Sequence, residues 1–338
     1  MEESMKKIIV FGATGNIGAY FIDYCNEQID KSQYEIVAVG RRKTDFFSRY
    51  DVEYIKVDIC NDIDFNKLPI TDVYAIVNLT GMLPAYSKEN DVFSYVETNI
   101  KGSLRILEYA RKVNADRVLY TQTWAVQGGY WNCVSELSPL MPRKLVYKGD
   151  HAFYCITKSM IEDTMEFYHQ EYGIKNFVFR LPNVYMYHPD SEYYVDGSKK
   201  VVAYRYMIEQ AIQGKDIELW GDPKAYKDIL YVKDLCQMMY RSLFAKCNGG
   251  TYNAGTGQKT TLLEQIQGII DVFSPIDKKV NIIYNPNGSG FTSFVMDVNN
   301  AKTELGYMPE YNYINYLVDY KKEREQKRFN QLWTSKMS

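Results

Sequence analysis

The sequence predicts an α/β protein with a doubly wound parallel sheet and a smaller, discontinuous C-terminal lobe. Short apolar, β-branched runs alternate with runs of helical periodicity through the first half of the chain. A glycine-rich turn joins the first strand-like run to the first helical one. Such repeated strand–helix units give parallel strands, because each helix crosses over the sheet before the next strand begins. The alternation ends after Leu181, which predicts a different arrangement for the remaining chain.

The first half of the chain supplies the strands and helices of the predicted sheet. The first run, KKIIV, is apolar and β-branched after its two lysines, as in a buried parallel strand. Between residues 91 and 113, apolar side chains recur near one helical face, as in a helix that packs on a sheet. We expect strands at residues 6–12, 35–40, 52–58, 73–81, 117–121 and 176–181, and helices at residues 16–28, 91–113 and 152–172.

The second half of the chain has fewer strands and a loop-rich, aromatic start at residues 183–200. We expect helices at residues 201–213, 262–273 and 314–332, and short strands at residues 217–220 and 229–232. The last helix contains KKEREQKR, a charge run that is typical of a solvated helix face. The expected domains are residues 1–181, mainly the sheet; residues 182–310, mainly a second lobe with segments that return to the sheet; and residues 311–338, a charged helix.

Charge and composition narrow the class of protein. The formal net charge of the 338 residues is −2, so we expect no nucleic-acid partner. Six cysteines are scattered without a C-x-x-C pair, as in a reduced cytosolic protein, and no metal site is expected. The start MEESMKKIIV lacks an apolar signal segment, and no apolar run approaches the ~20 residues of a membrane helix. We expect a cytoplasmic protein without a membrane partner.

The stretch FGATGNIGAY places Gly12, Gly15 and Gly18 where the first strand turns into the first helix. Glycine there allows a tight turn, the approach of a phosphate, and close packing of the helix on the sheet. The helix N-terminus adds unpaired N–H groups and partial positive charge. The spacing alone also fits an ordinary glycine turn. Its position directly after a strand and at the start of a helix predicts a dinucleotide-binding site.

The end of the second strand predicts which dinucleotide binds. An acidic residue at this position would accept hydrogen bonds from the ribose hydroxyls of NAD, but Arg41 and Arg42 follow Gly40 instead. Guanidinium groups suit a 2′-phosphate, so NADP is preferred to NAD unless the arginines are only surface charges. Asp58, at the end of the third strand, is a candidate partner for the adenine amine. An equally good interpretation makes Asp58 a turn or cap residue.

The pair Tyr154 and Lys158, in YCITK, predicts acid–base chemistry. Residues four apart on a helix share one face, so the phenol and the ammonium are expected in one site. A phenol has a pKa of ~10, and the nearby Lys158 ammonium and an oxidised, positively charged nicotinamide would both favour tyrosinate. Lowering that pKa by about 3 units requires about 4 kcal/mol. Tyr154 could then exchange a proton with a sugar or alcohol oxygen while a hydride moves at the carbon.

The chain resembles the extended short-chain dehydrogenase/reductases, and among them the nucleotide-sugar epimerase/dehydratase family. The resemblance extends from Lys6 to about Pro309 and rests on an ordered set of motifs. These are GATGNIG, VNLTG, ETNIKGSLRILEYA, VLYTQTWAVQGG, YCITK, RLPNVY, DILYVKD and YNAGTG. It implies a Rossmann sheet that binds NAD(P) and a C-terminal lobe that binds the substrate.

The resemblance also implies roles for individual residues. Thr123 would hydrogen-bond the reacting oxygen, Tyr154 would be the acid/base, and Lys158 would tune Tyr154 and hold the nicotinamide ribose. Asn183 and Lys227 match positions near the substrate diphosphate. The positions that match the cofactor site, apart from Tyr154 and Lys158, are Gly12, Thr14, Gly15, Asn16, Ile17, Gly18, Arg41, Arg42, Asp58, Ile59, Leu79, Gly81, Asn99 and Leu181.

Several positions depart from the family pattern. Dehydratases carry Thr-Asp-Glu after the fifth strand, whereas this chain has no carboxyl group in residues 121–124, which disfavours dehydration. Gln127 replaces the tyrosine of the family's Val-Tyr-Gly, and residues 183–189 are remodelled. Lys227 stands where the family has an arginine, and it can meet a diphosphate only as a point charge.

The expected function is hydride transfer at a ring carbon, C4, of a nucleoside-diphosphate sugar. An epimerase would oxidise the sugar and return the hydride to the other face, and a 4-ketoreductase would consume NADPH; the residues leave both open. A rival from another class is a non-catalytic NADP-binding protein with a redox-sensing or scaffold role. The presence of both Tyr154 and Lys158 argues against it. By analogy with the family, we expect a homodimer through the helices at residues 91–113 and 152–172.

Overall fold

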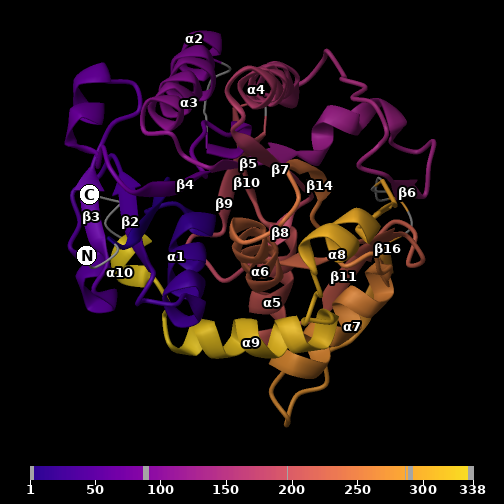
Figure 1. The fold of residues 1–338 in the computed structure, drawn as a ribbon. Helices are drawn as coiled ribbons and strands as arrows, with labels where there is room; N and C mark the ends of the chain where they lie inside the picture. Colours follow the sequence, from indigo (N-terminus) through magenta and orange to yellow (C-terminus); the bar gives the residue numbers. More distant parts are fainter. Residues whose placement is uncertain (1–3, 87–90, 196, 286, 288–291, 334–338) are drawn as a thin grey trace.

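The centre of the fold is a seven-stranded parallel sheet, seen in a computed structural model that describes residues 4–86, 91–195, 197–285, 287 and 292–333. Its strand order is β14-β7-β5-β4-β1-β2-β3 (Figure 1). The strands are β1 (Lys6–Phe11), β2 (Tyr34–Gly40), β3 (Glu53–Lys56), β4 (Val73–Asn78), β5 (Arg117–Thr123), β7 (Lys175–Leu181) and β14 (Gly249–Asn253). The order reverses between β1 and β4, where ligands of such sheets bind.

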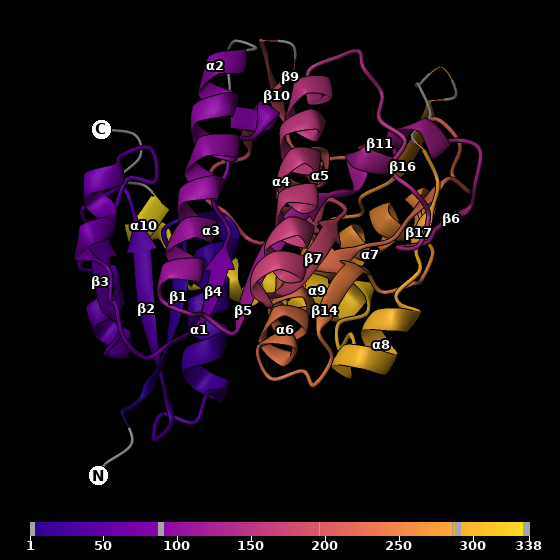
Figure 2. The same ribbon diagram turned by 45° about the horizontal axis from the view of Figure 1, so that its top comes forward.

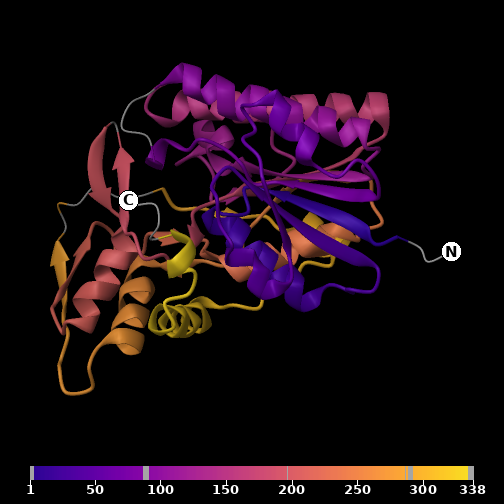
Figure 3. The same cartoon turned by 90° about the vertical axis from the view of Figure 1, so that its left-hand side faces the viewer.

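Helices cover both faces of this sheet. On one face lie α3 (Ser103–Lys112) and α4 (His151–Tyr172), and α2 (Val92–Tyr95) with the π-helix η4 (Val96–Gly102) continues the line of α3 (Figure 2). The other face is covered by α1 (Asn16–Gln28) and α6 (Val232–Leu243), which pack against each other (Figure 3). The shorter 3-10 helices are η1 (Phe46–Tyr50), η2 (Asp62–Lys67), η3 (Pro84–Tyr86) and η5 (Trp124–Tyr130).

The C-terminal lobe consists of helices and small two-stranded sheets. Its helices are α5 (Ala203–Ile212), α7 (Leu262–Phe273), α8 (Asn299–Leu305) and α9 (Tyr313–Glu325). The last helix, α10 (Asn330–Trp333), returns to the N-terminal side, where Trp333 packs against Tyr20 of α1 (Figure 1). The remaining strands are β6 (Glu136–Leu137), β8 (Val184–Tyr185), β9 (Glu192–Val195), β10 (Ser198–Val201), β11 (Ile217–Trp220), β12 (Tyr226–Lys227), β13 (Leu230–Tyr231), β15 (Thr260–Thr261), β16 (Ile282–Asn285) and β17 (Val295–Met296).

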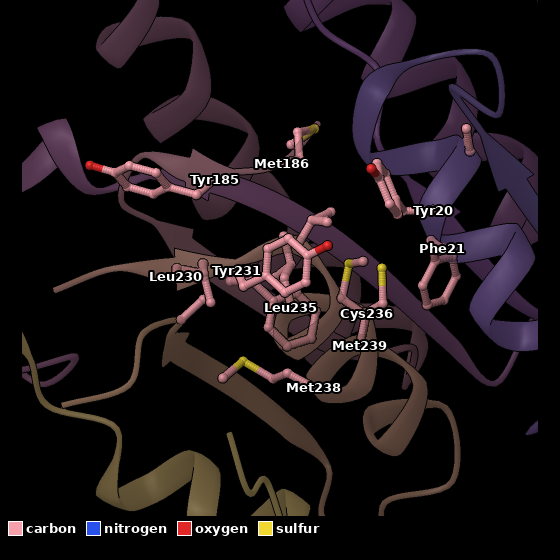
Figure 4. Packing of buried hydrophobic residues seen from close by; sticks show 14 of the residues in the cluster. Tyr20, Phe21, Tyr185, Met186, Leu230, Tyr231, Leu235, Cys236, Met238 and Met239 are labelled. Carbon is pink, nitrogen blue, oxygen red and sulfur yellow. The ribbon is translucent and has the colours of Figure 1, made fainter. Parts of the chain in front are cut away.

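The sheet is buried on both faces, as its apolar strands predict. Alternate residues of β1 enter two separate apolar clusters: Ile8 and Val10 join the cluster beneath α1 and α6, and Ile9 and Phe11 join the cluster beneath α3 and α4. The first cluster continues into the C-terminal lobe, where aromatic and sulfur-containing side chains of α1, α6, β8 and β13 pack together (Figure 4). One apolar core therefore connects the sheet to the lobe. In the described part of the chain, no helix is both long and apolar enough to cross a membrane.

Most of the expected elements are confirmed, and two differ in an informative way. The helices expected at residues 16–28 and 262–273 and the strand at residues 217–220 have the predicted bounds. The helix expected at residues 91–113 is divided by the π-helix η4, which adds a residue to each turn. The helix expected at residues 314–332 ends at Glu325 and resumes as α10 at Asn330.

The C-terminal charge run KKEREQKR is only partly solvated. The prediction that it forms a solvated helix face is wrong for Glu323. Glu323 is 1% exposed, and its carboxylate lies 2.9 Å from the ammonium of Lys233 on α6. Glu323 shares a helical face with the buried Tyr316 and Tyr320, seven and three residues earlier. A carboxylate can be buried there because a cation from another helix compensates its charge.

Candidate active site

The glycine turn leaves an open cradle at the carboxyl end of β1. Gly12 has a φ of +83°, and a Cβ there would lie 2.9 Å from the Leu79 carbonyl; a Cβ on Gly18 would overlap the Gly12 carbonyl oxygen. The Gly15 N–H donates to that oxygen at 2.8 Å, which closes the turn. Among the described residues, no side chain caps the N-terminus of α1. This cradle fits a dinucleotide pyrophosphate, which needs close backbone approach and N–H donors.

The other residues of the turn are held in place by the fold. Thr14 is 5% exposed, and Ile17 packs against the first apolar cluster. Asn16 begins α1 directly after Gly15. The contacts of Thr14 and Ile17 with the rest of the fold therefore fix the position of the turn.

The two arginines after β2 differ in their surroundings. Arg41 is exposed, whereas Arg42 is half-buried and donates through Nη2 to the carbonyl oxygen of Thr14 at 2.7 Å. The Nη1 of Arg42 is buried and has no hydrogen-bond partner among the described residues. Tyr54 donates from its hydroxyl to the Arg42 carbonyl oxygen. Arg42 thus lies against the glycine turn, and its Nη1 is available to donate hydrogen bonds to a ligand.

Asp58 takes part in the turn that follows β3. Its Oδ1 accepts the Cys60 N–H at 3.0 Å, and its own N–H donates to the Asp64 carboxylate at 2.8 Å. Ile59 is 8% exposed, and its side chain occupies the space beside Gly102, where a Cβ would clash with it. Both residues follow β3 and support the turn that precedes η2.

Asn99 connects the end of β4 to α4. Its Oδ1 accepts the Met82 N–H at 2.7 Å, and its Nδ2 donates to the Met82 carbonyl oxygen at 3.2 Å. The same Nδ2 donates to Thr157 Oγ1 at 3.2 Å. Asn99 lies within η4, and π-helical turns often occur at functional sites. Leu79, whose N–H donates to the Phe11 carbonyl oxygen, and Gly81 line the segment between β4 and Met82.

The three candidate catalytic residues lie at the carboxyl end of the sheet. Tyr154 and Lys158 are one turn apart on α4, with 8% and 3% of their surfaces exposed. Thr123 ends β5, and Ala125 and Val126, which follow it on η5, pack in the same small apolar cluster as Tyr154. The structure thus brings β5, η5 and α4 together around the expected acid/base group.

Burial controls the protonation of this pair. It raises the pKa of the Tyr154 phenol, and Cys155 and Tyr95 add to the rise. It also lowers the pKa of Lys158 to about 7. In the ligand-free protein, the cost of desolvating the tyrosinate dominates the Tyr154 pKa. Lowering this pKa requires a charged Lys158, charge that arrives with a ligand, or both.

The last matched cofactor position is Leu181 at the end of β7, and the matched substrate positions Asn183 and Lys227 come later in the chain. Leu181 pairs with Thr123 across β7 and β5, so it lies beside the candidate catalytic set. Asn183 follows and is exposed. Lys227 lies in β12, is half-buried, and has its pKa lowered by desolvation. Leu181 is placed directly at the candidate site, whereas Asn183 and Lys227 belong to the neighbouring lobe.

Two residues that the sequence did not single out, Thr157 and Trp124, organise the site. Thr157 donates to the Tyr154 carbonyl oxygen at 2.8 Å while it accepts from Asn99. Trp124 stacks between Trp131 and Phe294, with ring centroids 4.3 and 4.4 Å away, and so fixes the chain directly after Thr123. Only Thr157 had a sequence signal, since a threonine three residues after Tyr154 can bond back to its carbonyl.

This arrangement defines a dinucleotide-binding enzyme of the extended short-chain dehydrogenase/reductase class. Residues 8–255 match the model of the NAD dependent epimerase/dehydratase family. The chain therefore belongs to the NAD dependent epimerase/dehydratase family.

The relatives include both epimerases and dehydratases. A putative UDP-glucose 4-epimerase of Methanocaldococcus jannaschii is 24% identical over 311 residues, which cover 90% of this chain and 93% of the relative. A dTDP-glucose 4,6-dehydratase of Haemophilus influenzae is 25% identical over 336 residues, covering 90% and 94%. The crystal structure of a Thermotoga maritima UDP-glucose 4-epimerase with UDP-glucose shares the fold, with a TM-score of 0.76, 21% identity, and coverage of 95% and 99%.

Proposed function

We propose that this protein is an NAD(P)-dependent nucleotide-sugar 4-epimerase. The observation that carries the proposal is the placement of Thr123, Tyr154 and Lys158 at the carboxyl end of the sheet that also bears the glycine cradle. Similarity to a putative UDP-glucose 4-epimerase supports the epimerase class and a UDP-sugar as the first substrate to test.

In this proposal the cradle of Gly12, Gly15 and Gly18 holds the pyrophosphate, and Lys158 holds the nicotinamide ribose. When bound, the dinucleotide supplies the hydride acceptor and donor. Tyr154 Oη takes the proton from the sugar C4 hydroxyl and later returns it to the C4 oxygen. Thr123 Oγ1 hydrogen-bonds that oxygen and so orients it toward Tyr154. The buried position of Tyr154 excludes water from the proton transfer.

Dehydration is disfavoured because the end of β5 lacks a free carboxyl group. Gln122 points instead to Glu162 of α4, donating to it at 3.0 Å. Glu162 is itself ion-paired with Arg180 at 3.1 Å. Glu162 is thus engaged by Gln122 and Arg180 and is not a free carboxyl group at the end of β5.

A second candidate function, a 4-ketoreductase, is favoured by the arginines after β2. Arg41 and Arg42 suit the 2′-phosphate of NADPH, which a reductase consumes once per turnover. The deciding experiment identifies the dinucleotide released from the denatured protein, follows a sugar labelled with deuterium at C4, and in a separate assay offers a 4-keto sugar with NADPH. Retained label, inverted C4 and bound NAD would support the epimerase; stoichiometric loss of NADPH would support the reductase. Bound dinucleotide without turnover of any nucleotide sugar would favour the non-catalytic alternative.

Arg42→Ala is expected to weaken NADP binding about 10- to 100-fold, since a charge-assisted hydrogen bond contributes about 1.5–3 kcal/mol. NAD binding serves as the internal control. Because NAD lacks the 2′-phosphate, its affinity reports only the loss of the contact between Arg42 and the Thr14 carbonyl. Dissociation constants for the four dinucleotides can be measured by calorimetry. Equal losses for NAD and NADP would exclude a role for Arg42 in recognising the phosphate.

We also propose that the protein forms a homodimer through the outer face of α4. A groove on this face is lined mostly by apolar side chains, among them Leu145, Ile156, Met160 and Phe167. Phe167 is 53% exposed in this groove, so its ring is available to a partner. Phe167→Asp is expected to give monomers by light scattering. Met308→Asp, at a similarly exposed site away from α4, is the control and should leave the mass unchanged.

A further inference from the structure

The ammonium of Lys158 lies over an aromatic ring. Its Nζ is 3.9 Å from the centroid of Tyr120, which is on β5. Tyr120 is 1% exposed and Lys158 is 3% exposed, so the contact is shielded from water. A cation over a ring face is attracted by the ring quadrupole, and the attraction grows when both groups are desolvated.

The ring of Tyr120, rather than its hydroxyl, makes this contact. The Tyr120 hydroxyl is buried and has no hydrogen-bond partner among the described residues. The ring is held between neighbouring strands, because Tyr120 pairs with Asn78 of β4 and Val178 of β7. It therefore offers Lys158 a fixed platform, and phenylalanine would provide the same ring face.

We propose that Tyr120 is a positioning residue for Lys158: its ring holds the ammonium in place and favours the charged form of the lysine. Burial alone opposes that form, since it brings the pKa of Lys158 to about 7. The catalytic consequence rests on the proposed function, in which a charged Lys158 stabilises the tyrosinate of Tyr154. The electrostatic contact itself does not depend on that function.

Other titratable groups surround the pair without replacing the ring. Tyr154 and Cys155 precede Lys158 on α4, and Tyr95 approaches Tyr154 from α2 with a ring separation of 6.3 Å. Glu162 follows on α4 and is paired with Arg180. The phenols of Tyr95 and Tyr154 and the thiol of Cys155 stay neutral near pH 7, because burial raises the pKa of each.

The test measures the pKa of Lys158 in the ligand-free protein, by NMR of lysine labelled at Cε. Lys158→Arg identifies the signal. Tyr120→Leu is expected to lower this pKa by about 1.5 units, and Tyr120→Phe should leave it unchanged. Tyr109→Leu is the matched control, because Tyr109 is buried in the same apolar cluster as Tyr120. No substrate is needed, so the result stands even if the proposed function fails.

If Tyr120→Leu does not fold, a second series of variants tests the proposal. In this series Tyr120 is replaced by phenylalanine with one, two or three ring fluorines. Fluorine weakens the quadrupole with little change of shape, so the Lys158 pKa should fall stepwise. In an active enzyme, the alkaline limb of kcat should move to lower pH by the same amount, since the charged lysine is lost sooner. An unchanged pKa across the series, or an equal fall in Tyr109→Leu, would overturn the proposal.

Discussion

Tyr154→Phe is expected to lower kcat by about 10²- to 10⁴-fold, the usual contribution of a positioned acid–base group. The substitution removes only the hydroxyl, and the remaining ring still fills the space between Tyr95 and Cys155. Dinucleotide binding should persist, because the glycine cradle of β1 and α1 is untouched. Steady-state kinetics, together with dissociation constants for the dinucleotide, separate the loss of proton transfer from a loss of binding.

Tyr95→Phe is the matched control for this experiment. Tyr95 is another buried phenol, 1% exposed, whose ring centroid is 6.3 Å from that of Tyr154. Its loss of a hydroxyl should change kcat little. If Tyr154→Phe kept most of its activity, or if both variants lost activity equally, Tyr154 would not be the acid/base. Retained biological function in Tyr154→Phe would instead point to the non-catalytic alternative.

Glu323→Leu is expected to lower the free energy of unfolding by about 3–5 kcal/mol, as for other buried pairs that lose one partner. The Glu323 carboxylate lies 2.9 Å from Lys233 Nζ and 3.6 Å from Arg328 Nε, and it accepts the Tyr20 hydroxyl. Removing the Glu323 carboxylate leaves the cations of Lys233 and Arg328 with less neighbouring negative charge in a largely buried site. Urea denaturation followed by circular dichroism measures the change.

Glu325→Leu provides the control, because Glu325 is exposed on the same helix. Its substitution should change stability by less than about 0.5 kcal/mol, as expected for a surface position. Equal destabilisation by both variants would mean that helix α9 itself, rather than the buried carboxylate, was disturbed. A Glu323→Leu protein as stable as the original would show that apolar packing fully replaces the ion pairs.

Much of the fold follows from local sequence pattern. The apolar, β-branched strands and the glycine turn predict the parallel sheet, because these signals depend on neighbouring residues alone. The helix bounds at residues 16–28 were predictable for the same reason. The π-helix η4 was not, because it depends on Asn99 reaching Met82 and Thr157 from one turn.

The candidate site was predictable where residues lie close in the chain. Tyr154 and Lys158 could be placed on one helical face from their spacing. The partners of Glu323 could not be found this way, since Tyr20 and Lys233 come from distant elements. The same limit applies to Tyr120, whose contact with Lys158 depends on how α4 lies over β5. From sequence, Asp58 could be a ligand or a turn residue, and its contacts with Cys60 and Asp64 are compatible with both.

The edge position of β14 has a consequence for synthesis on the ribosome. β14 (Gly249–Asn253) pairs with β7 (Lys175–Leu181), yet α5 and α6 are made between them. Until β14 emerges, the nascent chain presents β7 as an open edge with unpaired backbone groups, and such edges pair readily with other chains. The sheet that carries the glycine cradle is therefore completed late in translation.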